Sequence, residues 1–189
     1  MNAVLAVAAI PFALVLLIGA GMSSTRHEDV TSAAPPFPME LPPAPRPFPG
    51  TSTGCTVADP TGTGGCVTPA TAWMLGQVET AFGSMPTSCW DAHAWNPRSD
   101  HPNGKGCDIT FGEIGTFPSP TNTDHGWLVS YWLQSHADVL HVKYLIWQGL
   151  IWYSSRADQG WVAYSGGGVY DPSDPTGGHY DHVHISTTT

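Results

Sequence analysis

The chain has 189 residues, a formal net charge of −9 at pH 7 and only 11% charged residues. Its six Lys and Arg residues are scattered, so no basic cluster can neutralise phosphates, and a nucleic-acid partner is excluded. The length allows one folded domain, and the low charge with eight Trp indicates an aromatic-rich, loop-rich secreted domain instead of a cytosolic helical one.

An apolar run opens the chain. Residues 3–22 carry no charged side chain, and twenty residues in a helix span about 30 Å, the thickness of a bilayer core. No basic residue precedes the run, as one would in a standard signal peptide, but small residues follow it. We therefore predict a hydrophobic helix within residues 1–30. It is either an uncleaved membrane anchor or a cleaved signal peptide, and both alternatives place the remaining chain outside the cytoplasm.

A proline-rich segment comes next. Residues 33–50 contain eight prolines, which favour the extended polyproline II conformation and cannot pack a core. We predict that residues 31–50 form a semi-rigid linker, and that residues 51–189 form the folded domain.

Four cysteines lie in the first part of this domain, and none belongs to a CxxC pair. In an exported chain an even number of cysteines indicates disulfides, here two, with three possible pairings. The pairing Cys55–Cys66 and Cys89–Cys107 is favoured because each bond closes a short local loop.

Two helices are predicted. Thr68-Pro69 is typical of an N-cap followed by proline at the first helical position, and Gly83 is suited to the end of that helix. A second helix is expected over residues 124–137. Apolar positions recur at helical spacing in the first helix: Trp73, Met74, Val78 and Phe82.

The strand signals follow the helices. Residues 142–153 fit two strands joined by a turn at Gln148-Gly149, and short strands are expected over residues 161–164 and 183–186. Because helices precede strands without regular alternation, the predicted fold class is α+β, with a small antiparallel sheet flanked by helices.

Two short stretches, residues 99–108 and 179–184, hold residues that can carry chemistry. On a regular strand His182 and His184 face the same side, about 7 Å apart, whereas Asp181 faces the other side unless the chain is still entering the strand. His101 and Asp108, separated by a glycine-containing loop, would add an imidazole and a carboxylate. Two imidazoles and a carboxylate form a suitable ligand set for Zn²⁺ and leave a position for water.

These residues resemble a known group of enzymes. His101-x6-Asp108 followed by His182-x-His184 is similar to the zinc peptidases of the LAS superfamily, and Ser99, His101, Gly104 and Asp108 match the SxHxxGxxxD pattern of its D-alanyl-D-alanine carboxypeptidases. His179, His182 and His184 also match the HxxHxH pattern of penicillin-insensitive murein endopeptidases. The resemblance covers roughly residues 89–186.

The resemblance implies zinc ligands at His101, Asp108 and His184. In the carboxypeptidases a glutamate three residues before the last ligand is the general base, and here that position holds Asp181, which is one methylene shorter. Either Asp181 or His179 would then be the base, and His182 would stabilise the charged intermediate. The implied function is zinc-dependent hydrolysis of peptidoglycan stem peptides at the bacterial cell wall.

Two other functions stay open. The first is a non-catalytic cell-wall peptide-binding module that keeps zinc for structure, and Asp181 in place of glutamate supports it. The second is a zinc-free, aromatic-rich adhesion domain. Carboxypeptidase and endopeptidase action are not distinguished by these residues.

Overall fold

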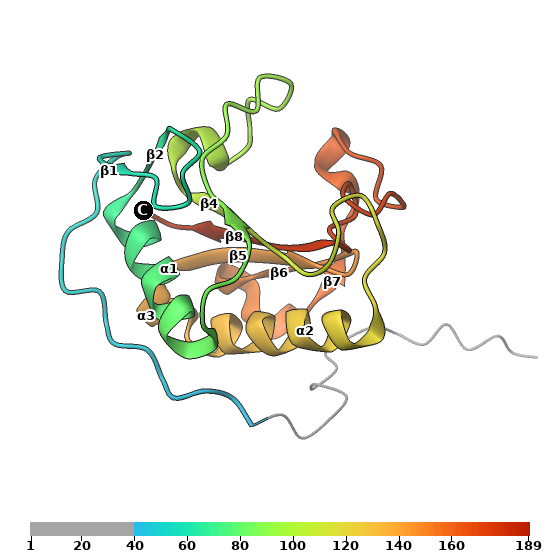
Figure 1. Cartoon of the computed structure of the whole chain (residues 1–189), viewed down its shortest axis with the longest axis horizontal. Helices are drawn as coiled ribbons and strands as arrows, with labels where there is room; N and C mark the ends of the chain where they lie inside the picture. Colours follow the sequence, from blue (N-terminus) through green and yellow to red (C-terminus); the bar gives the residue numbers. More distant parts are fainter. Residues whose placement is uncertain (1–39) are drawn as a thin grey trace, which may run out of the picture.

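The computed structural model describes residues 40–189 (Figure 1). The predicted hydrophobic helix and residues 31–39 of the predicted linker lie outside the described residues. Within the described range, no helix combines the length and the hydropathy needed to cross a membrane.

A six-stranded sheet forms the centre of the domain, and every pair of neighbouring strands in it is antiparallel. A separate two-stranded ribbon pairs β1 with β2. Together with the helices, this arrangement confirms the α+β class with a small antiparallel sheet. In spatial order the six strands are β3 (Thr87–Ser88), β4 (Gly106–Thr110), β8 (His182–Thr187), β5 (Val142–Trp147), β6 (Leu150–Tyr153) and β7 (Val162–Ala163), and the ribbon consists of β1 (Val57–Ala58) and β2 (Cys66–Val67).

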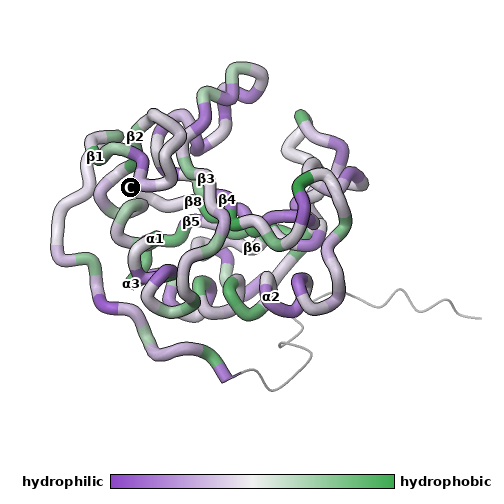
Figure 2. Tube along the Cα trace, in the orientation of Figure 1, coloured by the Kyte–Doolittle hydropathy of each residue, from purple (hydrophilic) through white to green (hydrophobic). Residues whose placement is uncertain are grey.

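The helices α1 (Pro69–Phe82), α2 (Pro120–Ser135) and α3 (Ala137–Leu140) lie on one side of this sheet (Figure 1). Strand side chains alternate between the two faces, so Val183 and Ile185 of the central strand β8 join the apolar core beneath the helices. Figure 2 shows hydrophobic stretches along these strands, while the connecting loops mix hydrophilic and hydrophobic residues. His182 and His184, which alternate with these two residues along β8, therefore face the opposite side of the sheet.

Helix α1 has the ends that its sequence predicts. The Thr68 hydroxyl accepts a hydrogen bond from the Thr71 amide (3.2 Å), Pro69 occupies the first turn, and Gly83 closes the helix with φ of 82°. Residues of the first turn also tie the helix to the sheet, because the Thr71 and Thr187 hydroxyls lie 2.8 Å apart.

Helix α2 begins before the predicted boundary at residue 124. Ser119 caps it by accepting from the Asn122 amide (3.2 Å), and Pro120 is the first helical residue. The same Ser/Thr-Pro signal that marks α1 is thus present at residues 119–120, and the apolar periodicity used for the prediction starts only one turn later.

The predicted hairpin is confirmed. β5 and β6 are joined by Gln148 and Gly149, whose φ angles of 51° and 69° are those of a tight two-residue turn. The short strand β7 and the terminal strand β8 lie where the sequence places them, with β8 starting one residue earlier, at His182.

Both disulfides have the predicted pairing, Cys55–Cys66 and Cys89–Cys107. Such bonds persist in oxidising compartments, so they agree with a location outside the cytoplasm. The first bond joins the segment before β1 to β2, and the second joins the residue after β3 to β4.

The described end of the proline-rich segment runs beside the helices (Figure 1). The Trp132 indole donates to the carbonyl of Pro42 (3.2 Å), and the Arg46 amide donates to the side chain of Gln77 (2.9 Å). Leu41 packs against the core. This part of the segment is therefore fixed to the surfaces of α1 and α2.

Gly126 provides a test of the packing between α2 and the sheet. A Cβ at this position would lie 2.2 Å from the buried Trp147 ring, so Gly126→Ala should lower the free energy of unfolding by about 1–3 kcal/mol through overpacking. Gly76 in α1 has open space around its Cβ position, and Gly76→Ala should raise stability by up to about 1 kcal/mol. Urea unfolding measures both. Equal effects of the two substitutions would contradict the packing described.

Candidate metal centre

The pairing of β4 with β8 brings two of the predicted ligands together. Asp108 and His184 are direct partners in the antiparallel register, and both side chains point to the face away from the helices. The Asp108 Oδ1 to His184 Nδ1 distance is 2.8 Å. The strand register alone therefore brings together two of the three predicted ligands.

His101 reaches the same point from a short 3-10 turn, His101–Asn103, that precedes β4. Its Nε2 lies 3.3 Å from Asp108 Oδ2 and 3.3 Å from His184 Nδ1. Gly104 lets the chain turn back into β4 with φ of 66°. A Cβ on Gly104 would lie 2.5 Å from Cys55 Sγ and 2.6 Å from the backbone of Val67. Only glycine fits this turn.

The three predicted ligands form one group. One ligand atom from each of His101, Asp108 and His184 lies within 4.8 Å of the others, so together they could hold a metal ion. Both histidines are buried, while the Asp108 side chain is 26% exposed. Two imidazole nitrogens and a carboxylate oxygen suit zinc and other first-row metals that accept imidazole, and three protein ligands is the number that catalytic zinc sites use.

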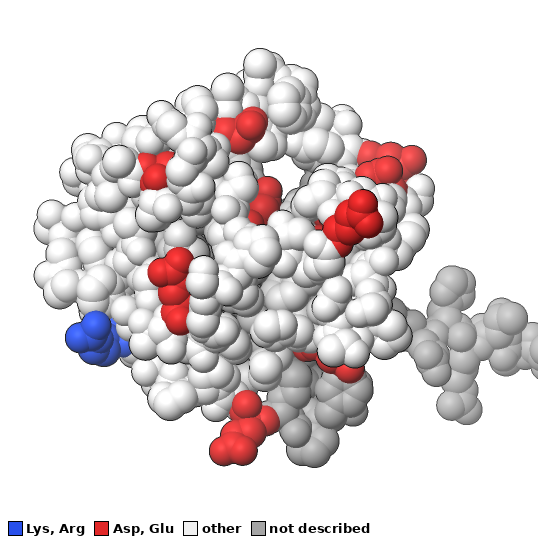
Figure 3. Space-filling view, viewed as in Figure 1, with Lys and Arg blue, Asp and Glu red and all other residues white. Residues whose placement is uncertain are grey.

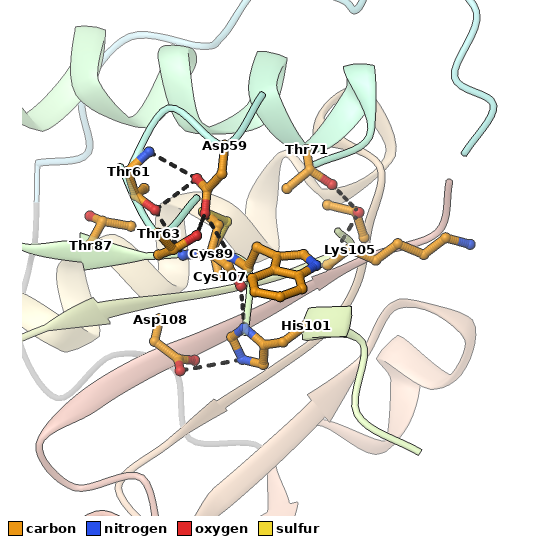
Figure 4. The surroundings of a disulfide bond; sticks show 12 residues. Asp59, Thr61, Thr63, Thr71, Thr87, Cys89, His101, Lys105, Cys107 and Asp108 are labelled. Carbon is orange, nitrogen blue, oxygen red and sulfur yellow. Dashed lines mark hydrogen bonds and ion pairs between the residues drawn. A yellow bond between two sulfur atoms is a disulfide. The ribbon is translucent and has the colours of Figure 1, made fainter. Parts of the chain in front are cut away.

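The second nitrogen of His101 is held by a disulfide-linked segment. Nδ1 donates to the carbonyl of Cys89, and Cys89 is bonded to Cys107, the residue directly before Asp108 (Figure 4). The Asp59 carboxylate supports the same segment by accepting from the Trp90 amide (2.8 Å). One covalent bond thus links the group that orients His101 to the strand that carries Asp108.

The second nitrogen of His184 starts a chain of hydrogen bonds. Nε2 lies 3.0 Å from the Ser186 hydroxyl, Ser186 also bonds to the Asp100 carboxylate, and Lys143 Nζ lies 3.0 Å from Asp100. Without a metal, Nδ1 donates to the ionised Asp108. With a metal bound at Nδ1, Nε2 would carry the proton and donate to Ser186, whose own proton goes to Asp100, so the chain would support the metal-binding tautomer.

The charges of the ligand group are strongly coupled. Burial lowers the pKa of His101, but the charge and hydrogen bond of Asp108 outweigh burial and raise this pKa to about 9. Burial alone would raise the pKa of Asp108, whereas the neighbouring His182 and His101 hold it well below its usual range. Without a metal, His101 therefore keeps a proton that shields Asp108. A metal must displace that proton, so its affinity should fall at acidic pH.

Two further residues of the predicted site lie next to the ligand group. His182 faces the group, whereas Asp181 lies behind His182. His182 Nε2 is 3.8 Å from Asp108 Oδ1, so this ring faces the group. The Asp181 carboxylate is fully buried and lies behind His182, where it accepts from His182 Nδ1 (2.5 Å), the Thr176 hydroxyl (2.6 Å) and the Gly115 amide (2.7 Å). As expected for a residue entering the strand, Asp181 reaches this region from the loop, but its oxygens are turned toward these donors.

The His179 ring completes the histidine cluster, with its centroid 4.6 Å from that of His182 and 5.6 Å from that of His184. Its Nδ1 is buried and has no hydrogen-bond partner within residues 40–189. Burial lowers the pKa of His179 well below its usual range, and the nearby His182 and His184 lower it further. The ring is therefore a neutral polar group at the edge of the site.

A cavity of about 540 Å³ opens over these residues. Its floor is the helix-free face of the sheet. Its sides are two loops that rise above this face in Figure 1, residues 89–100 (the first loop) and residues 164–181 (the second loop). Figure 3 shows a hollow between the two loops and more acidic than basic side chains on this side of the molecule. The ligand group is thus accessible to a ligand of peptide size, and a cationic or neutral ligand suits the surrounding charge.

Several contributors to the site were not predicted. Ser186 lies two residues after His184 on the same strand face, and this period-2 spacing could have indicated it. Asp100 and the Cys89 carbonyl form their hydrogen bonds to Lys143 and His101 only once the chain has folded. Their roles could not be inferred from local spacing.

Comparison with known proteins gives one family. A family model described as VldE, C-terminal domain, matches residues 63–180, well over half of the chain, and the chain therefore belongs to this family. The match includes His101 and Asp108 and ends before the strand that carries His184. No curated protein and no solved structure gives a significant match.

The hydrogen-bond chain behind His184 can be tested by metal binding. Ser186→Ala removes the acceptor of the Nε2 proton, and we expect zinc affinity to fall by about 10–100-fold. Competition titration with a chromophoric chelator measures this affinity. Ser154→Ala is the matched control, because that hydroxyl bonds only to the Lys143 carbonyl at the surface. An unchanged affinity in Ser186→Ala would contradict a role for this hydrogen-bond chain in metal binding.

Proposed function

From the geometry of the site, we propose that the protein is a zinc-dependent peptidase that hydrolyses peptide bonds in peptidoglycan stem peptides. The observation that carries the proposal is the ligand group His101, Asp108 and His184, which lies at the floor of an open cavity with a paired Asp181–His182 beside it. The similarity of these residues to LAS-superfamily zinc peptidases supports the substrate class.

The metal and the protein divide the chemistry. His101, Asp108 and His184 would hold the zinc ion, which would supply polarisation of a carbonyl and a more acidic water. The residues of the chain must then hold the substrate and move the protons. The two ligand histidines are excluded from proton transfer, because one nitrogen of each ring would bind the metal and the other is hydrogen-bonded. His101 Nδ1 bonds to the Cys89 carbonyl, and His184 Nε2 bonds to the Ser186 hydroxyl.

His182 is the residue placed to act as the general base. Its Nδ1 is bonded to Asp181, so its Nε2 faces the ligand group and can accept a proton from the attacking water. The same nitrogen can pass this proton to the leaving amine when the peptide bond breaks. This assignment differs from the sequence-based expectation, which gave the base role to Asp181 or His179 and a stabilising role to His182.

Asp181 acts through His182. Burial raises the pKa of this carboxyl, but hydrogen bonds from His182, Thr176 and Gly115 lower it to about 2. The carboxylate thus stays ionised and supports a positive charge on His182 during proton transfer. The shorter aspartate fits this role, because its oxygens are already used by three donors behind the ring.

His179 has a separate part in the proposal. Its neutral ring lies next to His182, and it presents an edge to the cavity. A neutral imidazole can donate a hydrogen bond to a carbonyl oxygen that gains charge during hydrolysis. We assign His179 this stabilising role.

The non-catalytic alternative has one observation in its favour. The Asp181 carboxylate, expected as a base, is turned away from the ligand group toward Gly115 and Thr176. A zinc-containing module of this kind would bind wall peptides and cleave none.

Metal dependence distinguishes these functions. Zinc-loaded protein should release muropeptide fragments from purified peptidoglycan, as detected by mass spectrometry, and a chelator should abolish the release. His101→Ala should lose both zinc and activity, whereas His125→Ala, an exposed histidine of α2, should keep both. Binding of wall fragments without any cleavage in the zinc-loaded protein would favour the non-catalytic module.

The base assignment has its own test. His182→Ala should keep one zinc per chain and lower kcat by about 10²–10⁴-fold, because only proton transfer is removed. Asp181→Asn should lower kcat in the same direction with little change in KM. Metal analysis beside steady-state kinetics separates these effects. Full activity of His182→Ala would overturn the assignment, and loss of zinc from it would place His182 among the ligands instead.

A further inference from the structure

Aromatic rings form a second wall of the cavity, next to the ligand group. Two of them stand on the helix-free face of the sheet, on β5 and β6, and the others belong to the two loops above it. Together the rings define the aromatic wall: Trp95, Tyr144, Tyr153, Tyr164 and Tyr170.

The aromatic wall is uncharged. Burial raises the pKa of Tyr164 to about 12, so this phenol keeps its proton at neutral pH. The Arg98 guanidinium beside the wall donates to the Gly167 carbonyl (3.3 Å). The wall therefore offers ring faces, hydroxyl groups and one partly engaged cation, which suits a neutral ligand more than an ionic one.

Trp95 is a second and independent observation. Its side chain is 64% exposed, although an indole of this size usually packs against the protein. Its ring centroid lies 4.9 Å from that of His93, and His93 stacks on the ligand His101 at 4.8 Å with planes only 8° apart. A stack of rings thus runs from the ligand group to the mouth of the cavity and ends in an exposed indole. Exposed apolar surface at a cavity mouth marks a contact site.

The two loops that carry the wall are joined to each other. Asn96 Nδ2 donates to the Tyr170 hydroxyl (3.3 Å), so the tip of the first loop is bonded to the second loop. This bond and the one from Arg98 hold the Trp95 and Tyr170 segments in place before any ligand arrives. A preorganised wall loses little conformational entropy on binding.

We propose that the aromatic wall is a binding site for the sugar rings of the glycan strand to which the stem peptide is attached. A pyranose ring has apolar C–H faces and a polar rim of hydroxyl and amide groups. The wall has the matching character, because its ring faces are bordered by phenol hydroxyls and by the Asn96 and Thr176 side chains. This inference rests on the proposed function for the identity of the polymer.

An apolar side chain of a peptide is a less suitable occupant. It would offer no hydrogen bond to the hydroxyl of Tyr164 in the wall once water is displaced, which is unfavourable. A neutral sugar satisfies both the faces and the polar groups.

Direct binding tests the inference without requiring catalysis. The probe is chitotetraose, a neutral tetramer of N-acetylglucosamine, titrated into the intact zinc-loaded protein by calorimetry. Trp95→Ala should weaken binding by at least about tenfold, and Trp95→Phe should restore most of the affinity because it keeps a ring face. Trp73→Ala is the matched control, since Trp73 lies on the outer side of α1 against Phe48 and Arg46. Absence of binding to the wild type, or equal affinity in Trp95→Ala, would overturn the inference.

Kinetics with two substrates separates this inference from the proposed function. One substrate is a disaccharide-linked stem peptide, and the other is the same peptide without sugar. Trp95→Ala should lower kcat/KM at least tenfold on the first and leave the second unchanged. If neither substrate is cleaved by the wild type while chitotetraose still binds through Trp95, the proposed function fails and the sugar site stands. If both are cleaved and Trp95→Ala affects them equally, the sugar site is wrong and the peptidase proposal stands.

Discussion

The antiparallel register between β4 and β8 sets Asp108 directly opposite His184, and the rest of the site is built around this pair. β8 is the central strand and is buried on both faces, with Val183 and Ile185 in the core and the histidines on the other side. A shift of one residue in this register would move the histidines into the apolar core and the aliphatic side chains into the cavity. The core that the helices cover thus also fixes the orientation of the site.

The same arrangement places ionisable side chains in a largely buried position, where a charge is unfavourable unless an opposite charge or a hydrogen bond compensates it. His101, Asp108 and His184 approach one another at 2.8–3.3 Å in a largely buried position, and in the absence of a cation the proton on His101 offsets the charge of Asp108. Every group behind them is satisfied: the Cys89 carbonyl and Ser186 hold the ring nitrogens, and Asp181 holds His182. The outer ring nitrogens are thus hydrogen-bonded, while the three inner ligand atoms lie close together. Such a polar cluster is suited to a metal ion.

The sequence predicted those parts of the fold whose signals are local. The caps Thr68 and Gly83 and the turn Gln148-Gly149 depend on backbone preferences that act within a few residues, and all three are confirmed. β4 was not predicted, because Gly106, Asp108 and Thr110 alternate with only two apolar residues and gain their strand conformation from pairing with β8. The ligand set came from motif spacing. The role of Asp181 could not be predicted in this way. Its carboxylate is oriented by hydrogen bonds from Thr176 and Gly115, and both residues lie in loops that show no spacing pattern with Asp181.

The central claim is that His101, Asp108 and His184 bind one metal ion together. X-ray absorption spectroscopy of the zinc-loaded protein tests it most directly, because it reports the type and distance of the atoms bound to the metal. The account predicts one zinc per chain with only nitrogen and oxygen ligands at about 2.0–2.2 Å, and scattering from two imidazole rings. A sulfur ligand at about 2.3 Å, or a protein that retains no zinc at neutral pH, would contradict it.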